Sequence, residues 1–182
     1  MVRTENEDAS FRDALQGLQT GDFSRLEPCF TTGLNPIPGP SQIIRWHQEG
    51  RFRGEPQAVA EALTCACFLG RTDVAEYLLA QGVDPSAGAS TGMDALHWAA
   101  NRGRLEIVRL LLRQKEPLET RSMYGATVLG TAVWSAIHEP RPGQLPIIEE
   151  LLNAGARVNE VEYPTGNEQV DALLQHFGTS AS

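Results

Sequence analysis

The chain has 182 residues, of which 41% are hydrophobic and 7% aromatic, so its length suits one domain with a continuous core. Its formal net charge of −8 disfavours general binding to nucleic acid or to anionic membranes, because both require clustered cations. The cysteines do not have the spacing of a disulfide framework, and the N-terminal segment MVRTENEDAS lacks the hydrophobic region of a signal peptide. The longest uncharged, apolar-rich run, Met123–Ile137, is too short to span a bilayer. We therefore expect a cytoplasmic protein.

The N-terminal part of the chain predicts a tail and a capping repeat. Residues 1–9 are rich in acids and are predicted to form a disordered tail. Two short apolar stripes at helical spacing follow on either side of Gly21, namely Phe11, Ala14, Leu15 and Leu18, and then Phe23, Leu26 and Phe30. A single domain is therefore expected over residues 10–177, beginning with a degenerate capping repeat at residues 10–36.

Residues 37–56 are predicted to be an insertion, because they interrupt a period of 33 residues that governs the chain after them. Within the insertion, Ser41–Glu49 has the pattern of a short helix that begins with a capping serine. Pro38 and Pro40 favour an extended entry to that helix. Insertions of this kind in repeat proteins lie on particular faces, often those that bind.

Residues 57–89 and 90–122 are two copies of one template. Glu61–Ser86 reads EALTCACFLGRTDVAEYLLAQGVDPS, and Asp94–Glu119 reads DALHWAANRGRLEIVRLLLRQKEPLE, 33 residues later. In each copy, two apolar stripes at helical spacing flank a glycine, Gly70 or Gly103, which predicts a helix, a turn and an antiparallel helix. One copy cannot bury both stripes alone, so the copies are expected to stack.

A third copy covers residues 123–162 and precedes a C-terminal cap. Leu151 follows Leu111 by 40 residues instead of 33, so seven extra residues are predicted around 136–146, where three prolines indicate a rigid loop. A one-sided apolar helix containing Val170, Leu173, Leu174 and Phe177 predicts a C-terminal cap at residues 163–177. Residues 178–182 are predicted to be a short tail.

The motifs ALHWAANRGRLEIVRLLL and LLNAGARVN resemble the ankyrin repeat, and the likeness extends from about Ala58 to Val161. It implies an all-α, ankyrin-type helical repeat solenoid with short hairpin-like loops, three repeats, and N- and C-terminal capping helices. The chain departs from the family pattern at Glu61, where a capping Thr is usual, and at Lys115, where a turn Gly is usual. A left-handed turn position prefers Gly, so Lys115 is expected to cost some stability.

Residue types with catalytic or metal-binding chemistry occur in patterns that indicate packing. Cys65 and Cys67 project about 200° apart on a helix, and no second pair follows at zinc-binding spacing. Pro140 interrupts any helical metal site at His138 and Glu139. The sequence contains no nucleophile motif and no phosphate-binding glycine loop. We therefore expect no catalytic residue, no metal, no cofactor and no enzymatic activity.

Ankyrin-like stacks usually bind other proteins through a concave face made of hairpin tips and the solvent side of each first helix. Carried over by position, the predicted contacts are Phe68, Asn101, Arg102, Met123, Tyr124 and Trp134. Aromatic and Arg side chains at the centre of an interface contribute about 2 kcal/mol or more each. The expected function is binding of a partner protein, without nucleic acid or membrane, and a monomer is the expected state.

Two alternative functions remain open. The 37–56 insertion could be a regulatory or inhibitory element whose Arg45, Trp46 and His47 enter a partner's cleft, or a small-molecule binder or enzyme could use a pocket near His47. The insertion could also cover Phe68, and the proline-rich loop could cover Trp134. Six cations against three acids between residues 102 and 121 leave a charge of +3, which favours an acidic partner, although a solvated surface gives the same count.

Overall fold

A computed structural model describes residues 5–31 and 39–179 of the chain, and in these residues the backbone forms helices and turns without strands. The chain divides into two compact units, residues 1–95 and residues 96–182. The all-helical fold agrees with the class that the sequence predicts.

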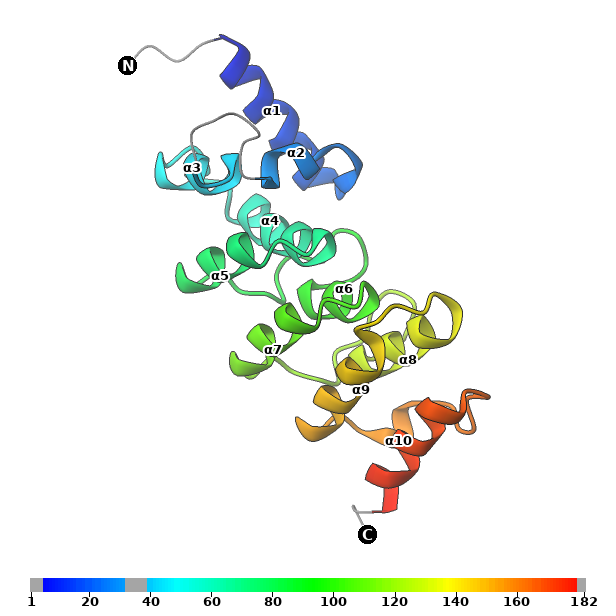
Figure 1. Cartoon of the computed structure of the whole chain (residues 1–182). Coiled ribbons are helices and arrows are strands. Elements are labelled where there is room, and N and C mark those ends of the chain that lie inside the picture. The colour runs from blue at the N-terminus through cyan, green and yellow to red at the C-terminus, as the bar shows by residue number, and fades with distance from the viewer. Residues whose placement is uncertain (1–4, 32–38, 180–182) are drawn as a thin grey trace. The chain divides into compact units, whose positions relative to one another are not determined.

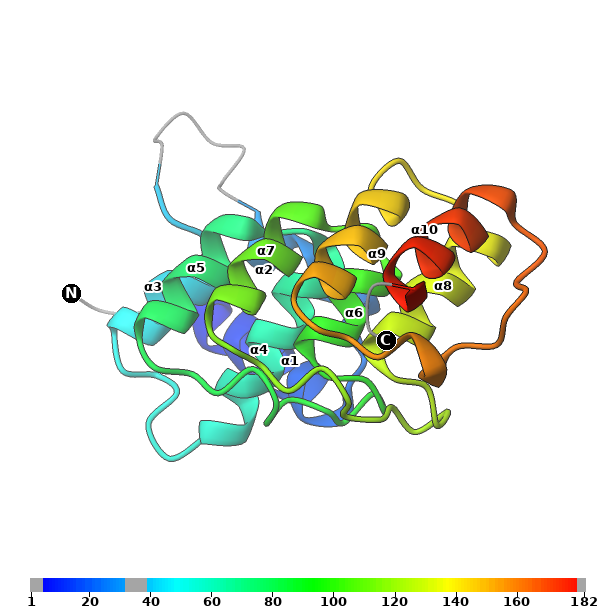
Figure 2. The same ribbon diagram turned by 90° about the horizontal axis from the view of Figure 1, so that it is seen from below.

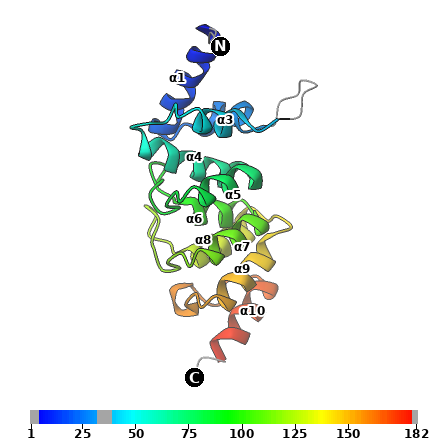
Figure 3. The ribbon, with the colours of Figure 1, turned by 90° about the vertical axis from the view of Figure 1, so that its left-hand side faces the viewer.

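The first unit contains a capping segment, a short inserted helix and one helix pair. Its elements are α1 (Glu5–Thr20), the 3-10 turn η1 (Phe23–Arg25), α2 (Glu27–Phe30), α3 (Gln42–Gln48), α4 (Pro56–Leu69) and α5 (Thr72–Ala80). The pair α4 and α5 lies side by side, α1 packs against α4, and α3 contacts α2 and α5 (Figures 1 and 3). Gly70, with φ of 78°, ends α4 and starts the turn into α5, as the sequence predicts.

The predicted disordered tail at residues 1–9 is wrong for its second half. Helix α1 begins at Glu5, and its first turn contains three acids, which interact favourably with the positive end of the helix dipole. Asp8 of this turn accepts a hydrogen bond of 2.7 Å from Arg51 Nη2. The Arg51 guanidinium also lies 4.3 Å from the ring centroid of Phe11. Residues 1–4 lie outside the described part of the chain.

The 37–56 insertion contributes to the core of the first unit. The predicted helix is confirmed as α3, and the hydroxyl of Ser41 accepts from the amide of Ile44 at its start. Ile43, Ile44 and Trp46 are buried, and Trp46 packs edge-on against Phe11 with ring centroids 5.3 Å apart. The end of the predicted capping repeat and the start of the insertion, residues 32–38, lie outside the described residues.

The second unit contains most of α6 (Ala95–Asn101), followed by α7 (Leu105–Arg113), α8 (Val128–His138), α9 (Gln144–Asn153), the 3-10 turn η2 (Val158–Glu160) and α10 (Glu168–Thr179). Helix α8 packs against α9, and α9 also contacts α7 and α10 (Figure 2). Thr127 caps α8, because its hydroxyl accepts from the amide of Gly130 at 3.2 Å.

Both predicted irregular segments of this unit are shorter than expected. Helix α8 extends to His138 and α9 begins at Gln144, so the loop expected at 136–146 is reduced to residues 139–143. Pro146 is accommodated in the first turn of α9, where backbone amides have no partner within the helix. Helix α10 continues to Thr179, so the predicted tail at 178–182 begins as helix, and residues 180–182 lie outside the described part.

Candidate protein-binding surface

A tight turn between α7 and α8 exposes two apolar side chains. The amide of Gly125 donates to the carbonyl of Ser122 at 2.9 Å, and the amide of Ser122 donates to the carbonyl of Ala126 at 2.9 Å. Arg121 braces the turn through a 2.7 Å hydrogen bond to the carbonyl of Gly125. Met123 and Tyr124 are 70% and 75% exposed at this hairpin tip, so the backbone is held while both side chains face solvent.

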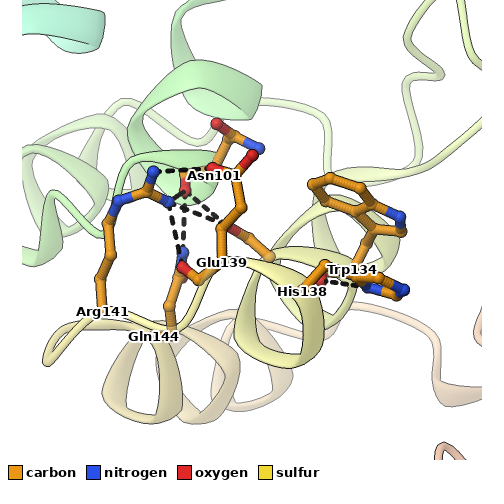
Figure 4. A network of polar contacts seen from close by, with 7 residues as sticks. Asn101, Trp134, His138, Glu139, Arg141 and Gln144 are labelled. Atoms are coloured by element: carbon orange, nitrogen blue, oxygen red, sulfur yellow. Dashed lines mark hydrogen bonds and ion pairs between the residues drawn. The ribbon is translucent and has the colours of Figure 1, made fainter.

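Helix α8 presents an aromatic pair. The rings of Trp134 and His138 stack with centroids 4.8 Å apart and an interplanar angle of 10° (Figure 4). Nδ1 of His138 lies 3.0 Å from the carbonyl oxygen of Trp134, which can only accept, so the ring donates through Nδ1. Trp134 remains 48% exposed. The proline-rich loop therefore leaves much of this indole open, although self-covering had been an alternative.

Asn101 contacts its neighbours through its backbone carbonyl. Its carbonyl, at the end of α6, accepts hydrogen bonds of 2.7 Å from Ser135 Oγ, 3.0 Å from Arg141 Nη1 and 2.8 Å from Gln144 Nε2 (Figure 4). The last carbonyls of a helix lack partners within the helix, so these side chains complete its C-terminus. Arg141 is held in turn by Glu139, whose Oε2 accepts from Nη2 at 2.7 Å.

Gly143 lets the loop after α8 reach the end of α6. A Cβ atom at this position would lie 2.3 Å from the carbonyl oxygen of Gly103, a distance that real structures do not tolerate. The seven-residue excess in the third repeat thus supplies side chains that cap α6. Sequence reasoning identified the insertion from its break in the period but missed Ser135, Glu139, Arg141 and Gln144, since spacing does not reveal which carbonyl they reach.

Arg102 lies next to this network and over an aromatic ring. Its guanidinium carbon is 5.9 Å from the ring centroid of Trp98, within the range of a cation–π interaction. Partial burial lowers the pKa of Arg102, and the neighbouring positive charge of Arg141 lowers it further. The group still carries its charge at neutral pH, because an arginine pKa starts far above 7. A cationic group and the indole of Trp98 therefore adjoin the capped end of α6.

Phe68 belongs to the first unit and is half-buried. Its ring lies 6.0 Å from that of Phe23 in the capping segment, with a tilted geometry. The side chain is therefore covered in part by the cap repeat, whereas the sequence had suggested covering by the 37–56 insertion.

The three alternative contact residues on α3 have different environments. Arg45 is exposed, but Trp46 is 5% exposed and belongs to the core, so it cannot enter a partner's cleft without unpacking. His47 Nδ1 lies 2.9 Å from the hydroxyl of Tyr77, and the two rings pack edge-on. Trp46 is therefore not available as a contact in the alternative function, because α3 packs its apolar face against its own unit.

The cysteines have the environment of packing residues. Cys65 and Cys67 are fully buried, and burial raises the pKa of both thiols, so neither supplies a thiolate at neutral pH. Burial also raises the pKa of Cys29. Among the described residues, no group of three or more His, Cys, Asp or Glu side chains is arranged to hold a metal ion. In the same residues, no helix has the length and apolar character needed to cross a membrane.

Comparison with known families identifies the repeats. The family model for ankyrin repeats, in three copies, matches residues 63–162, which is more than half of the chain. The chain therefore belongs to the ankyrin-repeat family. Ankyrin repeats are generally protein–protein interaction modules and generally not enzymes.

Two proteins illustrate the range of similar chains. The mouse (Mus musculus) protein described as "Protein fem-1 homolog A-like" is 39% identical over 67 residues, which are 37% of this chain and 10% of that protein. A chain in the structure of the Bd0816 predatory endopeptidase from Bdellovibrio bacteriovorus in complex with immunity protein Bd3460 has a TM-score of 0.55 and 28% identity. That match covers 65% of this chain and 64% of the other. This chain thus spans about a tenth of the mouse relative and just under two thirds of the bacterial one.

Proposed function

We propose that the protein binds another protein, without catalysing a reaction, through a surface of the second unit that contains Met123, Tyr124 and Trp134. The observation that carries this proposal is exposure. Four large apolar side chains are exposed in the described residues, and three of them are these predicted contacts, while Tyr163 is the fourth. Exposed aromatic residues on a braced turn and a helix face suit interface anchors, because little side-chain or backbone freedom is lost on binding.

Neighbouring groups extend this surface. Arg102 over Trp98 and His138 over Trp134 each pair a polar or cationic group with an indole, which supports contacts to both apolar and polar partner atoms. The bacterial structure is described as a complex between an endopeptidase and an immunity protein, which supports protein binding as the use of this fold.

The predicted preference for an acidic partner has weaker support. Arg109 is paired with Glu106 and Glu150, and Arg121 is paired with Glu160, so two of the basic residues that produced the local excess are neutralised within the unit. The proposal therefore rests on the exposed aromatic side chains, and the partner's charge does not enter it.

The experiment is proximity crosslinking from the hairpin tip. A photo-crosslinking amino acid placed at Ser122, beside the hairpin tip, captures partners from the native cell, and the captured protein is then purified and titrated against the chain. Tyr124→Ala and Trp134→Ala should each weaken its binding about tenfold or more. Tyr163→Ala is the matched control, since it removes an exposed aromatic ring elsewhere in the same unit. Equal affinity of all three variants and the unmodified protein would overturn the proposal.

A further inference from the structure

The sulfur atoms of the chain have very different environments. In the described part of the chain they belong to Cys29, Cys65, Cys67, Met93 and Met123. Cys65 and Cys67 are fully buried, and Cys29 is half-buried. Met93 is 6% exposed, whereas Met123 is 70% exposed at the hairpin tip between α7 and α8. Among these residues, Met123 therefore has the sulfur atom that a solute in water reaches most readily.

Ionisation also disfavours oxidation of the cysteines. A peroxide reacts with the thiolate form of a cysteine. Burial raises the pKa of the Cys29, Cys65 and Cys67 thiols, which lowers the thiolate fraction at neutral pH. A thioether has no proton to lose, so its oxidation to the sulfoxide depends on access to the sulfur and not on pH. Access and ionisation thus both favour reaction at Met123.

The side chain of Met123 has no part in the hydrogen bonds described above for the turn. Backbone groups within residues 122–126 form those bonds, and Arg121 braces the turn. The equivalent position in the preceding copy, 33 residues earlier, is Ser90, which is also exposed. A polar side chain is therefore compatible with this position of the repeat, and a more polar side chain at 123 should leave the fold intact.

Met123 lies beside Tyr124 in the surface proposed above to bind a partner protein. Oxidation converts its flexible apolar thioether into a polar sulfoxide, whose oxygen accepts hydrogen bonds. When partner atoms cover that oxygen without donating to it, its lost hydration opposes binding. The usual cost of an unpaired buried polar group corresponds to a loss of affinity of about tenfold or more.

We propose that Met123 is a peroxide-sensitive modification site that switches the partner-binding surface from apolar to polar. The thioether sulfur attacks one oxygen of hydrogen peroxide, so that an S–O bond forms and the O–O bond breaks. The sulfur is oxidised by two electrons to the sulfoxide, and the other oxygen leaves as water. Methionine sulfoxide reductases reverse this change. The inference rests on the proposed function, because the regulated event is binding at Met123, Tyr124 and Trp134.

Hydrogen peroxide itself is the probe for the first measurement. The purified chain is treated with it, and the addition of one oxygen atom is followed at each methionine by peptide mass spectrometry. Met123 should be oxidised about tenfold faster than the buried Met93, with a rate that stays constant as the pH falls below 7. Equal rates at the two methionines would overturn the proposal, as would a rate at Met123 that falls with pH.

The protein captured by the crosslinker at Ser122 is the probe for the second measurement. It is titrated against the chain before and after peroxide treatment, and the readout is the ratio of the two affinities. Oxidation should weaken binding by the parent about tenfold or more, and treatment with the reductases should restore it. Met123→Leu has no oxidisable thioether at this position, so its own affinity should be the same before and after peroxide.

Failure of this inference differs from failure of the proposed function. If Tyr124→Ala and Trp134→Ala leave the affinity unchanged, the binding surface is wrong and the switch fails with it. If both substitutions weaken binding but the oxidised parent binds like the untreated parent, the surface stands and the switch is refuted. Thermal melts followed by circular dichroism provide a further test: oxidation should leave the melting temperature nearly unchanged, and a drop that Met123→Leu prevents would show that oxidation acts on the fold instead.

Discussion

Replacement of Gln144 by methionine tests the account of the network at the end of α6. Gln144 is 2% exposed, and its Nε2 donates to the carbonyl of Asn101 at 2.8 Å. Its Oε1 is buried without a hydrogen-bond partner. Methionine has a similar volume and removes both polar atoms. The Asn101 carbonyl then keeps its hydrogen bonds from Ser135 Oγ and Arg141 Nη1.

The expected change in stability follows from two opposing contributions. Loss of the hydrogen bond should cost about 1 kcal/mol, while removal of a buried unpaired acceptor should return about 1–3 kcal/mol. The free energy of unfolding should therefore stay level or rise by about 2 kcal/mol. Ser135→Ala is the comparison, because it removes a 2.7 Å hydrogen bond to the same carbonyl without relieving an unpaired atom. That variant should lose about 1 kcal/mol.

Urea unfolding of the three proteins, followed by circular dichroism, measures both changes. If Gln144→Met lost as much stability as Ser135→Ala, the reasoning would be refuted. Oε1 would then have a partner, such as an ordered water in the adjoining cavity of about 310 Å³, which Gln144 lines together with Pro140 and Asn167.

Three further predictions concern individual side chains. Lys115 has a φ of 60°, and the equivalent residues Gly82 and Gly155 have φ values of 80° and 101°. Lys115→Gly should therefore raise the free energy of unfolding by about 0.5–1 kcal/mol. Lys115→Ala should give no such gain in a thermal melt. Glu61 is fully buried, and its Oε1 accepts from Gln57 and from the amide of Ser90 while Oε2 has no partner. Glu61→Met removes the acceptor from both hydrogen bonds, so it should lower the free energy of unfolding by about 1–3 kcal/mol in urea unfolding, and a gain in stability would contradict this. Hydrogen bonds from the Thr165 amide and hydroxyl lower the pKa of Asp171 below 3.8. This stabilisation is present above pH 3.8 and is lost as the pH falls through the lowered pKa. Asp171→Asn should therefore be less stable than the parent at pH 7 in urea unfolding, with a difference that shrinks in acid; a difference that stays constant with pH would contradict this.

Local sequence patterns predicted where the helices lie better than they predicted which distant residues each helix contacts. The Ser41 cap of α3 and the turn at Gly70 follow from a few adjacent residues, and both are confirmed. The start of α1 was missed because acidic residues were interpreted as a tail. Their helix is stabilised in part by Asp8 pairing with Arg51, which is 43 residues away in sequence.

The candidate contact residues show the same difference between what local sequence patterns predict and what tertiary packing decides. The hairpin position of Tyr124 and the solvent side of the α8 helix at Trp134 follow from the register of the repeat, and both side chains are exposed in the structure. Their role in binding stays a prediction. Trp46 had an equally suitable residue type, but the packing of α3 against Phe11 buries it.

The motifs that resemble the ankyrin repeat indicated the family. The repeat period and the helical spacing of apolar residues determined the order of the helices and the positions of most turns, because these features depend on residues within one or two helical turns of each other. Tertiary structure alone decided that the insertion in the third repeat caps α6 at Asn101 and that the side chain of Met93 is buried. Both depend on atoms that are distant in sequence and meet only when the helices pack. The free energy of burying and pairing those atoms is a property of the folded arrangement.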